Sequence, residues 1–390
     1  MRDQWEAAAL GEIVERVTER NADDVDNVLT VSAEHGLVQQ ELYFTKRVAS
    51  KNLANYWRVA PGDYVFNKSY SNGHPYGVIR RNRSSEPGVV SPLYIVMRSA
   101  SPQLVDGWLD LAFESRIFTD SIAAHLKEGG RAHGALNIRL ADFFSTRVPL
   151  PPAAVQRRII DLIHHADGAI VAARDTSETA AKAYGELLRT LFLQGESKPL
   201  GEIAEFVNGY PFKPAELDGH GLPVIRIKQL LDPNVTPDRS SAEIPESRHL
   251  RDGDLVFSWS GTLAVRLWER GPALLNQHLF RVMEADGICR PWLRFALDAS
   301  IEALNEQTHG STMKHITKKK LLVYPVNVPD VEVQRNVASL MQSVVQTFER
   351  ARAQADAITT ARRQVLTSLL SGDHEIPESY DKFLVGQGAG

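Results

Sequence analysis

With 390 residues, 43% of them hydrophobic, the chain is long enough for two to three domains with packed cores. Its formal net charge of −4 excludes a uniformly basic nucleic-acid coat, so local basic patches would have to meet any nucleic acid. The single cysteine, Cys289, excludes an internal disulfide framework and a cysteine-based zinc cage. The sequence has no apolar run of membrane-spanning length and no signal-peptide core, so we expect a cytoplasmic protein.

The first 152 residues predict an α+β domain. Short strands are expected at 28–31 and at 64–66, and the second of them follows the turn Gly62-Asp63. A helix is expected at 105–121, with large apolar residues on one face. This combination is of ordinary domain size and indicates one globule.

Residues 153–195 predict a long helix. Apolar residues recur at steps of three and four from Val155 to Leu191 without an intervening proline. Pro151-Pro152 and Gly195 supply start and stop signals. At 1.5 Å per residue such a helix is about 60 Å long, which favours a coiled coil over an ordinary globular helix.

The second half of the chain repeats these features. Leu10-Gly11-Glu12-Ile13 recurs as Leu200-Gly201-Glu202-Ile203, Gly62-Asp63 recurs as Gly253-Asp254, and Val155-Gln156-Arg157 recurs as Val333-Gln334-Arg335. The repeat predicts a second α+β globule at 196–330 and a second long helix at 331–372. Within the globule, strands are expected at 224–227 and 255–257, and a helix at 291–305.

Each long helix carries an uncovered apolar seam, so we expect the two helices to bury each other in a pseudo-two-fold arrangement. The alternative is two unrelated long helices in separate cores. The C-terminal tail at 373–390 ends in a glycine-rich run and is expected to be frayed.

The doubled order of these motifs resembles the specificity (S) subunit of type I restriction–modification systems, over nearly the whole chain. Three further segments of the second half resemble that family: residues 209–213 (Gly-Tyr-Pro-Phe-Lys), Asn276-Gln277-His278 in a strand, and the glycine-rich turn at 310–316. The first half departs from the pattern, because Ser91-Pro92-Leu93 stands where the second half has Asn276-Gln277-His278.

The resemblance implies an α+β fold with two target-recognition domains in pseudo-two-fold arrangement, joined by two long antiparallel coiled-coil helices. Each domain would read one half of a split target in double-stranded DNA. The helices would set the spacing and dock two adenine methyltransferase (M) subunits, with restriction (R) subunits as further partners. The resemblance implies no catalytic residue, cofactor or metal in this chain.

We expect the base-reading residues in loops that follow the repeated strands. Asparagine and glutamine can bind adenine through two hydrogen bonds, lysine and arginine can bind guanine, and serine and threonine can bind either. The candidates are Lys68, Ser69, Tyr70, Asn72 and His74 in the first half, and Lys228, Gln229, Trp259, Ser260, Thr262, Asn276 and Gln277 in the second. The alternative for each residue is an ordinary polar turn, and for Trp259 a core position.

Basic clusters near these loops suit DNA phosphates, which position a protein without reading sequence. The clusters are Arg80 and Arg81 with Arg83, and Lys314, Lys318 and Lys319 with Lys320. A solvated surface is the alternative. Arg157-Arg158 and Arg362-Arg363 on the long helices are expected to face solvent or a partner protein.

The sequence contains no motif of a self-sufficient enzyme. The nearest approach to the base-pocket motif of a methyltransferase, residues 72–76, has two residues between asparagine and proline and only one proline. There is no Walker lysine loop. His164-His165 lie beside acidic residues, but neighbouring residues of a helix point to different faces and form no metal site. We therefore expect catalysis to be delegated to partners.

An alternative function is a coiled-coil scaffold that bridges other proteins without binding specific DNA. The acidic net charge mildly favours that reading. The basic clusters and the duplicated polar loops speak against it.

Overall fold

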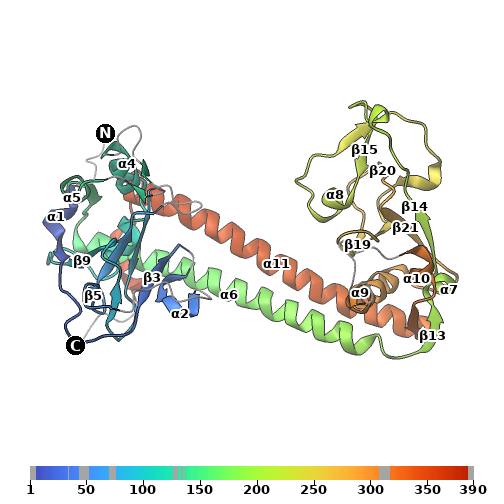
Figure 1. The fold of residues 1–390 in the computed structure, drawn as a ribbon, viewed down its shortest axis with the longest axis horizontal. Helices are drawn as coiled ribbons and strands as arrows, with labels where there is room; N and C mark the ends of the chain where they lie inside the picture. Colours follow the sequence, from blue (N-terminus) through green and yellow to red (C-terminus); the bar gives the residue numbers. More distant parts are fainter. Residues whose placement is uncertain are drawn as a thin grey trace. The chain divides into compact units, whose positions relative to one another are not determined.

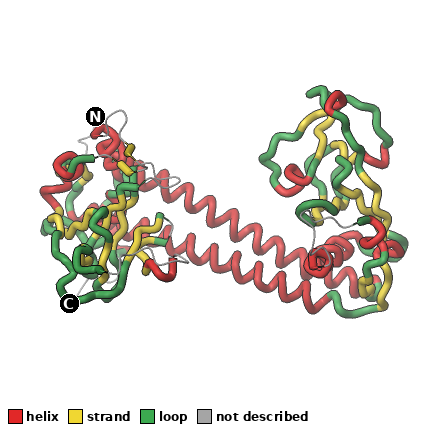
Figure 2. Tube along the Cα trace, viewed as in Figure 1, coloured by secondary structure: helices red, strands yellow, loops and turns green. Residues whose placement is uncertain are grey.

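The computed structural model divides the chain into two compact units, Met1–Val171 with Ala355–Gly390 (unit 1) and Ala172–Gln354 (unit 2). It describes residues 6–33, 35–43, 52–69, 76–125, 131–132, 135–136, 138–306 and 317–384. Both units mix helices and strands (Figures 1 and 2). The α+β class expected from the sequence is therefore confirmed.

Unit 1 is built on an antiparallel four-stranded sheet, with pairs of shorter strands beside it. The main sheet has the order β2 (Val14–Val17), β9 (Ile95–Ser99), β6 (Tyr64–Asn67), β7 (Val78–Arg81). The pairs are β1 (Ala7–Ala9) with β12 (Arg147–Pro149), β3 (Leu29–Ser32) with β4 (Gly36–Gln39), β5 (Trp57–Val59) with β8 (Gly88–Val90), and β10 (Arg131–Ala132) with β11 (Ala135–Leu136). Its short helices are α1 (Leu10–Ile13), α2 (Gln40–Tyr43), α3 (Trp108–Ala112), α4 (Arg116–His125) and α5 (Leu140–Phe144).

Unit 2 repeats this strand arrangement. Its main sheet has the order β14 (Ala204–Asn208), β21 (Leu279–Glu284), β18 (Leu255–Ser258), β19 (Ala264–Leu267). The second sheet has the order β16 (Asp238–Ser240), β15 (Leu222–Ile225), β20 (Ala273–Leu275), β17 (His249–Leu250), and β13 (Glu196–Pro199) pairs with β22 (Pro325–Val328). Besides the 17-residue helix α9 (Arg290–Glu306), unit 2 has the short helices α7 (Leu200–Ile203), α8 (Ile227–Leu231) and α10 (Lys318–Leu322) and the 3-10 helices η1 (Pro214–Glu216) and η2 (Glu246–Arg248).

The two long helices are α6 (Ala153–Leu191) and α11 (Val331–Leu370). In unit 1, Ile159 and Ile163 of α6 share a core with Leu366 and Leu369 of α11. In unit 2, residues near the other end of α6 share a core with residues near the start of α11. The start of each helix therefore packs with the end of the other, which confirms the antiparallel pairing. Each compact unit includes parts of both helices, because those parts complete its core.

The repeated Leu-Gly-Glu-Ile motif forms the short helices α1 and α7. Leu10 and Leu200 are completely buried in the two cores. A Cβ atom on Gly11 would lie 3.3 Å from the Cβ of Phe144, and one on Gly201 would lie 3.2 Å from the Leu322 carbonyl oxygen. Glycine at this position therefore lets a neighbouring short helix pack closely.

The repeated glutamine near the start of each long helix binds backbone groups. The Gln156 side chain accepts from the Val105 N–H at 2.9 Å and donates to the carbonyls of Pro151 and Gln103 at 2.8 and 2.9 Å. Gln334 accepts from the Cys289 N–H at 2.8 Å and donates to carbonyls of two loop residues. Both residues are buried. The repeated motif thus joins each long helix to the segment that precedes α3 or α9.

Three sequence expectations about local structure are corrected. The helix expected at 105–121 is divided into α3 and α4, because the Ser115 hydroxyl accepts from the Phe118 N–H and starts a new helix. The strand expected at 224–227 ends at Ile225, and Ile227 already belongs to α8. The segment Asn276-Gln277-His278, expected in a strand, is the turn between β20 and β21.

The expectation of a frayed tail is wrong for residues 373–384. This segment forms η3 (Glu378–Phe383) and is held against α6. Arg158 donates two hydrogen bonds to Asp381 at 2.6 and 2.8 Å, and the Tyr380 hydroxyl donates to Asp161 at 2.8 Å. Arg158, expected to face solvent or a partner, is therefore buried by the chain's own tail.

Candidate nucleic-acid interface

Three segments of unit 2 meet at one end of its main sheet: residues 208–213 after β14, 258–262 after β18, and 276–278 before β21. The Tyr210 N–H donates to the Leu275 carbonyl at 2.7 Å, and the Gln277 N–H donates to the Tyr210 carbonyl at 3.1 Å. The Trp259 indole donates to the Gln277 carbonyl at 3.2 Å. We call these three segments the unit 2 loop cluster. The sequence analysis singled out each of these segments separately, and the fold brings them together.

Gly209 allows the first segment to approach the third. A Cβ atom at this position would lie 2.2 Å from the Asn276 carbonyl oxygen, which is too close for any side chain. The Gly-Tyr-Pro-Phe-Lys motif therefore has a steric reason for its glycine. Its tyrosine is held in place by a hydroxyl that donates to Glu216 at 2.9 Å.

In the loop after β18, Trp259 and Ser260 are less accessible than expected. Trp259 is half-buried, and its ring lies 5.7 Å from the His278 ring and 5.8 Å from the Phe280 ring, centroid to centroid. Ser260 is buried, whereas Thr262 is exposed. The Ser258 hydroxyl donates to the Thr262 carbonyl at 2.7 Å and fixes the loop. Thr262 is thus the hydroxyl of this loop that a partner can reach.

Asn276 and Gln277 present amide groups at the centre of the loop cluster. Asn276 is 5% exposed, and its side-chain amide makes no hydrogen bond with another residue of the described ranges. The Gln277 side chain lies 3.4 Å from the Nε2 atom of His278 and is partly exposed. The partly exposed amide of Gln277 is a group that can bind a base edge.

Two further unit 2 candidates are structural. Gln229 is buried, and its side chain accepts from the Arg226 N–H at 3.2 Å and donates to the Thr236 carbonyl at 3.3 Å. Lys318 donates to the Phe206 carbonyl at 2.6 Å, so its ammonium group is already bound. The neighbouring candidates Lys228 and Lys319 are exposed.

The unit 1 loop corresponding to 258–262 is described only in part. The shared Gly-Asp motif aligns Lys68 with Trp259 and Ser69 with Ser260. Lys68 is half-buried, and Ser69 is exposed, with its N–H donating to the Asn67 side chain at 2.9 Å. The remaining candidates in the two halves, Tyr70, Asn72, His74 and Lys314, lie outside the described residues.

The arginine cluster of unit 1 is engaged within the unit. Arg80 donates to the carbonyls of Ala33 and Ile79, and burial lowers its pKa. Arg81 donates to Asp106 at 2.5 Å, and this hydrogen bond raises its pKa. Arg83 pairs with Asp110 at 3.1 Å. These side chains are therefore less available to phosphate than the sequence suggests.

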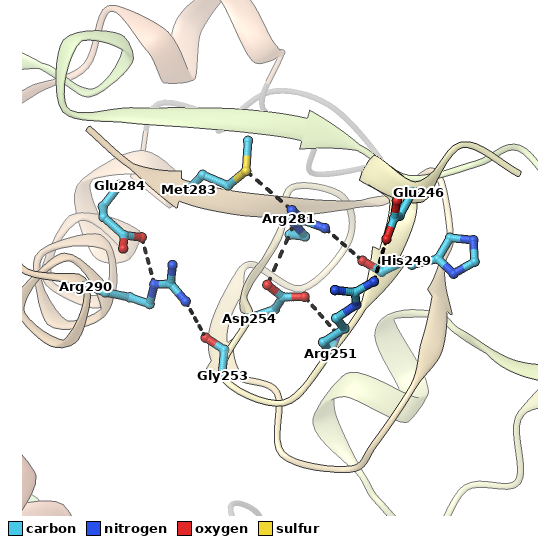
Figure 3. A network of polar contacts seen from close by, with 9 residues as sticks. All are labelled: Glu246, His249, Arg251, Gly253, Asp254, Arg281, Met283, Glu284 and Arg290. Carbon is cyan, nitrogen blue, oxygen red and sulfur yellow. Dashed lines mark hydrogen bonds and ion pairs between the residues drawn. The ribbon is translucent and has the colours of Figure 1, made fainter. Parts of the chain in front are cut away.

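The repeated Gly-Asp motif also has a structural role. In unit 2, Asp254 accepts from the Arg251 N–H at 2.8 Å and lies 3.8 Å from the Arg281 guanidinium (Figure 3). In unit 1, Asp63 accepts from the Ala60 N–H at 2.8 Å and forms two hydrogen bonds with Arg98. The aspartate closes the turn that leads into β6 or β18, so the loop beyond each strand starts from a fixed position.

Sequence reasoning missed two arginines near these loops, Arg20 and Arg248, each of which lies over an aromatic ring. The internal repeat contained a signal that could have identified both arginines. Aligning the two halves at an offset of 190 or 191 residues places Arg20 opposite Tyr210 and Trp57 opposite Arg248. Neither arginine belongs to a basic cluster, so local charge alone did not mark them.

Within the described ranges, no three histidine, cysteine, aspartate or glutamate side chains lie close enough to hold a metal ion. The His165 ring donates to the Asp161 carbonyl of its own helix at 2.8 Å. No helix in the same ranges is both long and apolar enough to cross a membrane.

Comparison with known proteins agrees with this architecture. Residues 195–359 match the family described as the type I restriction modification DNA specificity domain. The chain is 26% identical over 180 residues to the type I restriction enzyme EcoBI specificity subunit of Escherichia coli. That match covers 44% of this chain and 38% of the E. coli subunit.

Two solved structures share the fold. A chain from a study of complex assembly and conformational transition of the type I R-M system superposes with a TM-score of 0.61 at 17% identity, over 96% of this chain and 99% of that one. The type I S subunit from M. genitalium superposes with a TM-score of 0.58 at 15% identity, over 94% and 96%. Residues 195–359 thus match the type I restriction modification DNA specificity domain, and the chain shares the fold of these two solved structures along nearly its whole length.

Proposed function

We propose that this chain is the non-catalytic DNA specificity subunit of a type I restriction–modification complex. In this proposal, each unit reads one half of a bipartite target in double-stranded DNA. The observation that carries it is the four-stranded sheet that occurs in both units, with loops after equivalent strands. We call residues 68–69 after β6 and 91–94 before β9 the unit 1 loop cluster. The scaffold of the two units is shared, while the residues offered by the loops differ.

The accessible groups of the loop clusters suit base reading. Unit 2 offers the amide of Gln277 and the hydroxyl of Thr262, while Asn276, although it belongs to the same cluster, is buried. Unit 1 offers the ammonium group of Lys68 and the hydroxyl of Ser69. Amides favour adenine, lysine favours guanine, and hydroxyls bind either base. Different groups on a shared scaffold are what two different half-sites require.

We assign methyl transfer to adenine methyltransferase (M) subunits, two of which would dock on the long helices, with restriction (R) subunits as further partners. Both long helices keep large apolar side chains at the surface. Val333 and Leu340 of α11 are 40% and 46% exposed, and Val171 of α6 is 55% exposed. Such side chains on an outer helix face favour a protein partner.

The test is to express the tagged chain in its native host, identify the proteins that co-purify, and sequence the methylome with the gene intact and deleted. We expect an adenine methyltransferase to co-purify and a bipartite methylated motif to vanish on deletion. If no methyltransferase co-purifies and the methylome is unchanged, a scaffold without sequence-specific DNA binding takes the place of this proposal.

A further inference from the structure

In each unit, an arginine guanidinium lies over an aromatic ring. The Cζ atom of Arg20 lies 3.6 Å from the centroid of the Trp57 ring. The Cζ atom of Arg248 lies 5.6 Å from the centroid of the Tyr210 ring. A guanidinium over a ring is attracted by the ring's negative face, and its in-plane N–H groups stay available to other partners.

Arg20 of the unit 1 pair and Tyr210 of the unit 2 pair occupy equivalent positions beside the main sheets of their units. Val17 of β2 pairs with Val96 of β9, and Val207 of β14 pairs with Arg281 of β21. Val96 also pairs with Val65 on β6, and Arg281 pairs with Val256 on β18. Val65 and Val256 are equivalent because each stands two residues after the aspartate of the shared Gly-Asp motif. Val17 and Val207 are therefore equivalent too, because each is joined to its valine through one residue of the strand between them. Arg20 and Tyr210 each follow three residues later.

Trp57 of the unit 1 pair and Arg248 of the unit 2 pair also occupy equivalent positions. Arg58 pairs with Val89, and His249 pairs with Leu274. Arg58 and His249 each stand five residues before the aspartate of the shared Gly-Asp motif. Trp57 and Arg248 directly precede them. The same contact therefore occurs at the same place in both units, with the arginine and the aromatic residue exchanged.

Both pairs lie beside the loops proposed to read DNA. Tyr210 belongs to the unit 2 loop cluster, and its carbonyl accepts from the Gln277 N–H. The Trp57 indole donates to the Pro92 carbonyl at 3.3 Å. Pro92 stands in the turn before β9, as Gln277 stands in the turn before β21. Each guanidinium is thus held next to the turn between two sheets.

The backbone that carries Arg248 is also fixed. Arg281 donates to the carbonyl of the next residue, His249, at 3.1 Å (Figure 3). In the same network, Arg251 pairs with Glu246, at the other end of the segment 246–251. An arginine on a fixed backbone and a fixed ring loses little freedom when it binds a ligand.

The guanidinium of Arg248 makes no hydrogen bond or ion pair with any residue of the described ranges. Within the described ranges, Arg20 donates one hydrogen bond, to the Asn55 carbonyl, and forms no ion pair. Arg81 and Arg83, in contrast, pair with carboxylates of unit 1. A preorganised guanidinium group that forms no ion pair within its unit suits phosphate oxygens beside a DNA-reading loop.

We propose that Arg20 and Arg248 are equivalent phosphate-binding residues of the two units, each oriented by its aromatic partner. This inference rests on the proposed function. In it, the stack fixes the position of each loop cluster on the duplex backbone, while the loops read the bases.

The test uses the chain in its complex with the co-purified methyltransferase. Binding is measured by fluorescence anisotropy at several salt concentrations, on a duplex with the methylated motif and on a scrambled duplex of equal length. We expect Arg20→Ala and Arg248→Ala each to weaken binding by a similar factor on both duplexes. Each should lower the slope of log affinity against log salt by about one, since one phosphate contact is lost.

Three variants sharpen the test. Arg251→Ala, which removes an exposed arginine already paired with Glu246, should leave the slope unchanged. The double exchange Tyr210→Arg with Arg248→Trp reproduces in unit 2 the arrangement of unit 1 and should retain the wild-type slope. Tyr210→Phe controls for loss of the hydroxyl that binds Glu216.

An unchanged slope for Arg248→Ala would overturn the inference, as would a loss confined to the motif duplex, which indicates a base contact. If Arg248→Ala melts at a lower temperature than the wild type, Arg248→Lys replaces it as the test variant. A wild-type salt slope for Arg248→Lys supports a charge contact with phosphate, and a slope reduced as in the alanine variant refutes that contact. Failure of the wild-type complex to distinguish the two duplexes would instead count against the proposed function.

Discussion

Replacing Gln334 by alanine is expected to lower the free energy of unfolding of unit 2 by about 2–4 kcal/mol. The side chain is 1% exposed. It accepts from the Cys289 N–H at 2.8 Å and donates to the carbonyls of Pro329 and Gly287 at 2.9 and 3.3 Å. Alanine leaves the N–H and at least one carbonyl without a partner, and each such group costs about 1–3 kcal/mol. A water molecule entering the vacated space offsets part of this cost.

The measurement is urea unfolding, with hydrogen exchange of peptides used to separate the two units. Gln354→Ala is the matched control, since Gln354 is exposed on the same helix and its loss should change stability by less than about 0.5 kcal/mol. Gln156→Ala should destabilise unit 1 by an amount similar to that in unit 2, because its contacts are equivalent. A loss for Gln334→Ala no larger than that of the control would refute this account of the repeated motif.

Three further predictions concern the tail and the long helices. Arg158→Ala should release the tail, because Asp381 loses both hydrogen bonds, and trypsin should then cleave after Lys382 several times faster than in the wild type. Acid should also release it: the bonds from Arg158 hold the pKa of Asp381 below its ordinary value, so anchoring is complete above about pH 4 and is lost as the pH falls through the lowered pKa. Hydrogen exchange of the tail at low pH would report this, and unchanged protection would contradict it. Inserting one helical turn of about 5.4 Å in both α6 and α11 should change the number of unread bases in the methylated motif, and an unchanged motif would exclude a spacing role for these helices.

The sequence predicted the long helices and the repeat because both depend on periodicity and residue order. It did not predict which polar side chains are used within the fold. Gln229 and Lys318 are of types that bind DNA, yet both bind backbone groups of unit 2. Arg362 was expected to face solvent or a partner, and it pairs with Asp167 at 2.5 Å and Glu114 at 2.7 Å. These partners are far away in sequence, so no local pattern could identify them.

Equivalent positions of the two units fall into two groups. Gln156 and Gln334 are identical because they bind the same backbone groups, and the aspartates of the Gly-Asp motif are identical because they close the same turn. At the loop clusters the residues differ: Lys68 stands opposite Trp259, and Ser91-Pro92 stands opposite Asn276-Gln277. A shared scaffold constrains the first group. Under the proposed function, different half-sites would require different residues in the second group.

This division predicts that loop variants act on one half-site only. Thr262→Ala or Gln277→Ala should relax the base preference in the half read by unit 2, by about 1–3 kcal/mol for a lost direct contact. Lys68→Ala should relax the other half. Lys319→Ala with Lys320→Ala is the matched control, since exposed lysines that meet phosphates should weaken binding on all sequences alike. Methylome sequencing of each variant would show which half changes. If Thr262→Ala and Lys68→Ala relax the same half, or neither half, the assignment of one half-site to each loop cluster is wrong.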